Sequence, residues 1–144
     1  CRSPTADAVF KAQIKDAGLE QTIYIDSAGT HAYHIGNPPD QRSQQAALKR
    51  GYNMQGLRAR AVQPNDFAEF DYILAMDNDN FAILAESCPE QYQHKIGLFM
   101  QFCSDSNFGE EVPDPYFGGN QGFEKVLDMV ETAGEGLIKH LNQA

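Results

Sequence analysis

The chain has 144 residues, of which 42% are hydrophobic and 22% charged, the composition of one ordinary globular domain. Its net charge of −9 argues against non-specific binding to nucleic acid or to an anionic membrane surface. Three cysteines without a repeated spacing argue against a disulfide framework or a zinc site, and no apolar run is long enough to span a membrane. We therefore expect a cytoplasmic protein with reduced thiols.

The first predicted elements are a helix and a strand. Ser3 and Pro4 are the residue types of an N-cap and a first-turn proline, and they predict a helix that Gly18 ends. Residues 22–26 are mostly β-branched or aromatic and predict a strand that runs into the loop 27–30.

Four elements are predicted in the middle of the chain. Asp40 has the residue type of an N-cap for a helix that ends near Arg50. Residues 65–70 predict a helical turn. The apolar run 71–77 predicts a strand, and it is followed by a helix over residues 78–87.

The last third of the chain contains another strand and a long helix. Residues 96–100 predict the strand, and residues 102–117 form a polar loop. The C-terminal helix has one apolar face, made by Phe123, Val126, Leu127, Val130, Leu137, Ile138 and Leu141.

This alternation of strands and helices predicts an α/β fold over one domain, residues 1–144. We expect an open parallel sheet of about four strands with helices on both faces, a three-layer arrangement like that of flavodoxin and Rossmann folds. Ligands of such folds bind at the carboxyl ends of the strands. Because the chain begins with the helix that should follow a first, central strand, we expect that strand to be missing from this sequence.

Two segments, one at the start of the chain and one near residue 114, could contribute side chains to a site. Arg2 and Ser3 lie at a helix start, where free N–H groups attract anions and a guanidinium adds a two-pronged donor; the structural alternative is an ordinary Ser-Pro helix start. Asp114 lies between Pro113 and Pro115, whose restricted backbone suits a carboxyl directed into a pocket. An ordinary Asp-Pro turn is the alternative there.

Two further segments follow predicted strands. Residues 27–30, Ser-Ala-Gly-Thr, lie at a strand end, as site loops in α/β folds do, although an ordinary βα loop has the same composition. Residues 76–80 superficially resemble a calcium loop, but Phe81 and Ile83 do not fit one. We expect Asp77 or Asn78 to cap the following helix instead.

Together these motifs resemble the low-molecular-weight protein tyrosine phosphatases of the bacterial type, over essentially all of the chain. The resemblance rests on the order of five motifs: Cys-Arg-Ser-Pro-Thr-Ala at the start, Ser-Ala-Gly-Thr at 27–30, Gly-Asn-Pro-Pro-Asp at 36–40, Ala-Met-Asp at 75–77 and Asp-Pro-Tyr at 114–116.

The resemblance implies a reaction through a cysteinyl-phosphate. The signature loop of the family is a cysteine, five residues, an arginine and a serine, so Arg2 matches the phosphate-binding arginine and Ser3 the serine. The nucleophilic cysteine would then lie six positions before Arg2, upstream of Cys1. Cys1 matches a position that, in some members, is a redox partner of the nucleophile.

The resemblance also implies the remaining site residues. Asp114 matches the general acid and base, and Tyr33 and Tyr116 match aromatic positions that flank the substrate ring. His34 lies beside Tyr33 and is assigned to substrate binding, although a plain surface position is equally consistent with it. Ser27 matches a serine that supports the catalytic loop. No metal and no cofactor is implied.

The implied substrate is a phosphotyrosine protein, either a tyrosine kinase or its target. Three alternatives stay open. Two share the fold, a phosphoarginine phosphatase and an arsenate reductase, although Cys88 and Cys103 are far apart for the redox chemistry of the latter. The third is a non-catalytic phosphate-binding module.

Overall fold

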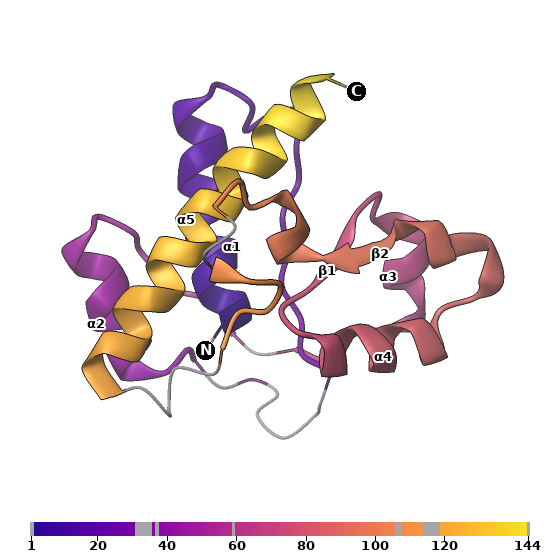
Figure 1. Ribbon diagram of the computed structural model, residues 1–144, viewed down its shortest axis with the longest axis horizontal. Coiled ribbons are helices and arrows are strands. Elements are labelled where there is room, and N and C mark those ends of the chain that lie inside the picture. The colour runs from indigo at the N-terminus through magenta and orange to yellow at the C-terminus, as the bar shows by residue number, and fades with distance from the viewer. Residues whose placement is uncertain are drawn as a thin grey trace.

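The computed structural model describes residues 2–30, 36, 38–58, 60–105, 108–113 and 119–143. A short parallel sheet lies between two groups of helices (Figure 1). On one side are α1 (Arg2–Asp16), α2 (Gln41–Lys49) and α5 (Gly119–Gln143); on the other are α3 (Pro64–Glu69) and α4 (Asn78–Ser87). The predicted α/β class, with a parallel sheet and helices on both faces, is confirmed.

The sheet pairs β1 (Ile73–Ala75) with β2 (Ile96–Leu98), and Leu74 lies opposite Gly97. Both strands fall inside the predicted runs 71–77 and 96–100, and both are shorter than predicted. A 3-10 helix, η2 (Phe99–Phe102), begins directly after Leu98 and bends the chain away from the ladder. A second 3-10 helix, η1 (Glu90–Lys95), was not predicted.

The predicted strand over residues 22–26 is not observed. A strand is defined by its ladder, and these residues pair with no strand in the described part of the chain. The segment instead runs to an isolated parallel bridge between Gly29 and Ala61. Its apolar side chains Ile23 and Ile25 still pack against the main core.

The helix boundaries follow local capping chemistry. Asp40 caps α2 by accepting a hydrogen bond from the Arg42 N–H at 2.8 Å, as predicted. Helix α1 ends at Asp16, two residues before Gly18, the glycine predicted to stop it, whose φ of +74° suits glycine. The predicted N-cap at Ser3 is wrong, because Arg2 is already helical; Pro4 still lies in the first turn, where its missing N–H has no helical partner to lose.

Two apolar clusters fill the layers on either side of the sheet. The larger joins α1 and α5 to the strand ends, and the smaller lies between the sheet and the pair α3 and α4. Every predicted apolar position of α5 except Phe123 belongs to the larger cluster or packs against it, and Phe123 is buried outside that cluster. This packing holds the start of α1 near the carboxyl end of β1.

Gly136 marks the closest approach of α5 to η2, and its replacement by alanine tests this packing. A Cβ there would overlap the Phe102 carbonyl oxygen, a backbone atom that cannot rotate away. We expect Gly136→Ala to lower the free energy of unfolding by about 1–3 kcal/mol, although alanine is the better helix former.

Urea denaturation measures this loss, and Gly134→Ala is the matched control on the same helix. The Cβ at Gly134 would overlap the end of the Gln13 side chain, which can move, so the loss should be smaller. Equal stability of wild type and Gly136→Ala would contradict the close packing.

Candidate active site

Arg2 lies in the first turn of α1 and reaches across to two other segments. Its Nη1 donates to Asp77 Oδ2 at 2.6 Å and to the carbonyl oxygen of Val112 at 2.8 Å. These bonds occupy both Nη1 hydrogens. The Nε–H and Nη2 groups, which form the other edge of the guanidinium, have no partner among the described residues. That edge is the planar pair of donors that binds two oxygens of a phosphate.

Asp77 holds Arg2 from the end of β1. Its Oδ1 accepts a hydrogen bond from the Asn80 N–H at 2.7 Å, which caps α4 as the sequence predicts. Burial alone would raise the pKa of Asp77, but the Asn80 N–H and the hydrogen bond and charge of Arg2 lower it below its ordinary value. The ionised carboxylate therefore fixes both the helix start and the guanidinium.

The chain ahead of Asp114 is fastened to the same place. The Val112 N–H donates to the Met76 carbonyl oxygen at 2.7 Å, and Val112 is fully buried. Beside it, the Asn78 N–H donates to Glu111 Oε2 at 2.8 Å. The segment that leads into Asp114 is thus fixed at the carboxyl end of β1, next to Arg2.

A cleft of about 610 Å³ opens at this junction. Its walls are Arg2, the end of β1, the loop from Phe108 to Pro113, and Lys125 and Met129 of α5. Arg2 and Lys125 are the cations that line it, against the carboxylates of Asp77, Glu110 and Glu111. Because the surroundings are acidic, an anion would depend on local donors such as the free edge of Arg2.

The loop 27–30 joins the site through Thr30. The Asn80 Nδ2 donates to Thr30 Oγ1 at 3.0 Å, which ties the loop to the first turn of α4. Ser27 lies at the base of this loop, where its N–H donates to Asp26 Oδ1 at 2.8 Å. Ser3 is half-buried in the first turn of α1, beside Arg2.

The structure therefore brings together Arg2, Ser3 and the segment leading to Asp114, with the Ser27 loop attached by one hydrogen bond. Cys1, Tyr33, His34, Asp114 and Tyr116 themselves lie outside the described residues. In the part of the chain that is described, no group of three or more His, Cys, Asp or Glu side chains could hold a metal ion. Over the same residues, no helix is long and apolar enough to cross a membrane.

Comparison with known proteins decides the family. The sequence profile of low molecular weight phosphotyrosine protein phosphatases matches residues 1–144. The chain belongs to this family. The family and the enzyme class predicted from the sequence, a protein tyrosine phosphatase, are therefore confirmed.

Individual members of the low molecular weight phosphatase family align over nearly the whole chain. A Synechocystis sp. protein that carries the name of a low molecular weight protein-tyrosine-phosphatase is 50% identical over 99% of this chain and 90% of its own. A protein tyrosine phosphatase crystal structure from Entamoeba histolytica has a TM-score of 0.95 at 45% identity, covering 99% of this chain and 90% of its own. An arginine phosphatase structure from Drosophila has a TM-score of 0.88 at 33% identity, covering 98% and 90%.

Within this phosphatase chain, sequence reasoning missed two site residues. The sequence predicts Asp77 as a helix cap and as part of the motif 75–77, but not as a partner of Arg2, and it gives no sign of Val112. Both accept a hydrogen bond from Arg2. The position of Asp77 at a strand's carboxyl end is a signal that could have identified it. Val112 contributes a backbone oxygen, for which no residue type is diagnostic.

The lowered pKa of Asp77 predicts a stability change that depends on pH. Because the folded pKa lies below the unfolded value of about 3.9, the stabilisation is present above that pH and is lost as pH falls through the folded pKa. Asp77→Asn should therefore cost about 1.5–3 kcal/mol at pH 7 and progressively less towards acid.

Urea denaturation of wild type and variant at a series of pH values measures the difference. Asp79→Asn removes an exposed carboxylate from the same helical turn and is the control. A loss that is the same at pH 7 and near pH 3 would contradict the ionised pair.

Proposed function

We propose that this protein hydrolyses phosphotyrosine in proteins through a cysteinyl-phosphate intermediate, with Arg2 binding the phosphate and Asp114 acting as general acid and base. The observation that carries the proposal is the bond from Arg2 to the Val112 carbonyl oxygen, across 110 positions of sequence. It brings a guanidinium with a free edge next to the segment that leads into Asp114. We also propose that residues 1–144 form one phosphatase domain.

The proposed reaction has two steps. A thiolate attacks phosphorus, the bond to the tyrosine oxygen breaks, and Asp114 gives its proton to that oxygen. Water then attacks the phosphocysteine, Asp114 accepts its proton, and the S–P bond breaks to release phosphate. The Nε and Nη2 edge of Arg2, with N–H groups at the start of α1, holds the equatorial oxygens in both transition states.

The nucleophile in this proposal is a cysteine six positions before Arg2, upstream of Cys1. Cys1 itself is adjacent to Arg2 and is proposed as a redox partner of that thiolate. Ser3, Tyr33, His34 and Tyr116 are proposed to bind the substrate.

Ser27 is proposed to support the catalytic loop. The proposed substrate is a tyrosine kinase or its target, and the proposed compartment is the cytoplasm.

Activity against defined phosphopeptides tests the proposal, using the protein with its upstream residues. We expect phosphotyrosine to be hydrolysed in the presence of a chelator, and replacement of the upstream cysteine by serine to abolish turnover. A chain that truly begins at Cys1 should be inactive but should still bind inorganic phosphate. Turnover by that shorter chain would contradict the placement of the nucleophile.

A phosphoarginine peptide supplies the second arm of the experiment. The Drosophila arginine phosphatase, at 33% identity and a TM-score of 0.88, is the observation that favours this second candidate function. Faster hydrolysis of phosphoarginine than of phosphotyrosine would replace the proposed substrate class. Arsenate reduction without phosphatase activity would favour the reductase alternative, and phosphate binding without either reaction would favour a non-catalytic module.

A further inference from the structure

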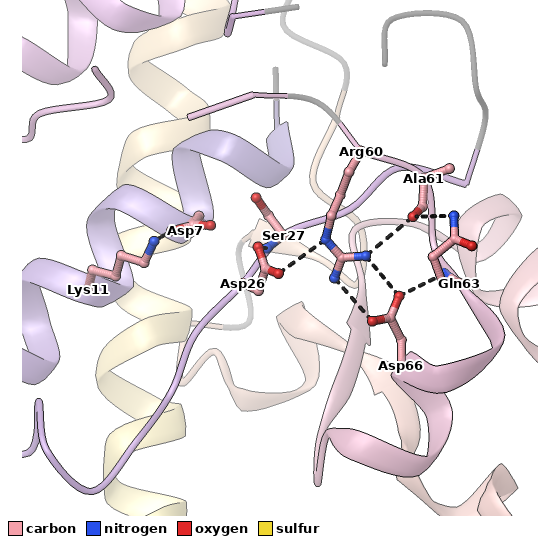
Figure 2. Close-up of polar contacts among 8 residues, drawn as sticks. All are labelled: Asp7, Lys11, Asp26, Ser27, Arg60, Ala61, Gln63 and Asp66. Carbon is pink, nitrogen blue, oxygen red and sulfur yellow. Dashed lines mark hydrogen bonds and ion pairs between the residues drawn. The ribbon is translucent and has the colours of Figure 1, made fainter. Parts of the chain in front are cut away.

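Arg60 lies outside the cleft but ties two segments of the fold together (Figure 2). Its Nε donates to Asp26 Oδ2 at 3.1 Å, while Nη1 and Nη2 donate to the two carboxylate oxygens of Asp66 at 2.9 and 3.2 Å. Asp66 is in the first turn of α3, where its Oδ2 also accepts from the Gln63 N–H at 2.7 Å. A single planar guanidinium thus fastens Asp26 to the start of a helix.

The segment that follows Asp26 is also held by backbone hydrogen bonds. The Gly29 N–H donates to the Arg60 carbonyl oxygen at 2.8 Å, and the Val62 N–H donates to the Gly29 carbonyl oxygen at 3.0 Å. Asp26 in turn accepts from the Ser27 N–H. Arg60 therefore fixes the loop 26–30 at two points: its side chain holds Asp26, and its main chain holds Gly29.

From this loop a chain of polar contacts continues to the phosphate-binding arginine. Thr30 accepts from the Asn80 side chain, and the Asn80 N–H donates to Asp77. Asp77 in turn accepts from Arg2. The loop that Arg60 fixes is thus in direct contact with the helix turn that holds the partner of Arg2.

The ion pairs of Arg60 are maintained at neutral pH. Its hydrogen bond to Asp66 is the main reason that the pKa of Arg60 is raised. Burial would raise the pKa of Asp66, but the hydrogen bond from Arg60 and the Gln63 N–H lower it below its ordinary value. The Asp66 side chain is 13% exposed and that of Arg60 33%, so solvent screens this pair only in part.

We propose that Arg60 is a positioning residue for the phosphatase reaction, acting through Asp26 on the loop 26–30. The inference rests on the proposed function, since it assumes that the cleft beside Arg2 is where phosphate is transferred. It also predicts a specific division of effects. Arg2 is held directly by Asp77 and the Val112 carbonyl oxygen, and Arg60 reaches this pair only through the loop, Thr30 and Asn80. Phosphate binding should therefore change much less than turnover when Arg60 is lost.

The test uses the protein with its upstream residues, as in the test of the proposed function. It compares Arg60→Met and Asp26→Asn with wild type, well below the midpoint of thermal unfolding of each protein. We expect each variant to lower kcat/KM for a phosphotyrosine peptide by about tenfold, because small displacements near a reacting centre are costly. The inhibition constant of inorganic phosphate should stay within about twofold of the wild-type value. Arg60→Lys should recover only part of the rate, because an ammonium cannot replace the planar fork of donors that pairs with both carboxylates.

Arg50→Met is the matched control. Arg50 is similarly exposed and pairs with Asp128 at 2.9 Å and Glu131 at 2.6 Å, but it does not line the cleft. The Arg50→Met variant should be less stable than wild type but should keep the wild-type kcat/KM. A merely structural role of Arg60 predicts the same behaviour for Arg60→Met.

Each outcome separates the inference from the proposed function. A wild-type protein that hydrolyses the peptide, with an Arg60→Met variant that retains its kcat/KM, overturns the positioning role alone. If Arg60→Met does not fold, Asp26→Asn decides: unchanged kcat/KM overturns the inference, and a tenfold loss with phosphate inhibition retained supports it. An inactive wild type overturns the proposed function and this inference with it.

Discussion

Replacing Asp114 with alanine should lower kcat for a phosphotyrosine peptide by about 10²- to 10⁴-fold, the usual contribution of a general acid. Without a general acid tyrosine would leave as an oxyanion, whose conjugate acid has a pKa of about 10. A proton delivered during bond cleavage neutralises the negative charge that develops on this oxygen. The inhibition constant of inorganic phosphate should change little, because Arg2 and the N–H groups at the start of α1 would still bind it.

The anchoring of Val112 is the structural reason for expecting so specific an effect. Val112 is buried, donates to the Met76 carbonyl oxygen and accepts from Arg2, only two residues before Asp114. The chain at Val112 is therefore fixed relative to the guanidinium. Removal of the Asp114 carboxyl group should not loosen Val112, because neither bond involves the Asp114 side chain.

Two substrates and a second variant make this prediction sharp. The leaving group of p-nitrophenyl phosphate is better than tyrosine, so Asp114→Ala should lose less activity with p-nitrophenyl phosphate than with the phosphopeptide. Asp114→Asn keeps the shape and removes only the acid, and it should match Asp114→Ala. An unchanged kcat in either variant, or equal losses with both substrates, would show that Asp114 does not protonate the leaving group.

Helix boundaries could be predicted well because they depend on neighbouring residues. Asp77 and Asp40 accept hydrogen bonds from N–H groups two or three positions ahead, and such spacing is visible in a sequence. The apolar face of α5 is equally visible, because its burial repeats with the helical period. The predicted strand over 22–26 failed for the opposite reason, since β-propensity says nothing about whether a partner strand lies alongside.

The connections within the site could not be predicted residue by residue. Arg2 and Asp77 are 75 positions apart, and Arg60 and Asp26 are 34 apart, so no local spacing marks either pair. The motifs identified Arg2 because its position in a signature loop is characteristic. Arg60 belongs to no such motif, and only the folded chain shows that its side chain spans a loop and a helix start.

Arg2→Lys is the second substitution with a large expected effect, and here phosphate affinity and turnover should fall together. The guanidinium of Arg2 performs two tasks at once: Nη1 bonds to Asp77 and Val112, while the Nε and Nη2 edge remains for phosphate oxygens. A lysine ammonium is one point with three hydrogens, so it cannot reach the Asp77 pair and present a planar edge to phosphate. We expect a loss of about 1.5–3 kcal/mol, the value of a hydrogen bond to a charged group, or roughly 10- to 100-fold in the inhibition constant of phosphate.

Because lysine keeps the positive charge, this substitution separates geometry from charge. If charge alone bound the phosphate, Arg2→Lys would retain the wild-type inhibition constant, and the proposed role of the free edge would be wrong. Arg58→Lys is the control, because Arg58 is exposed and its Nη1 donates to the carbonyl oxygen of the adjacent Leu57 at 2.7 Å. Both the inhibition constant of phosphate and kcat should be unchanged in this variant. In Arg2→Lys, kcat should fall at least as much as affinity, since the transition state spreads charge over the equatorial oxygens that the planar edge is shaped to hold.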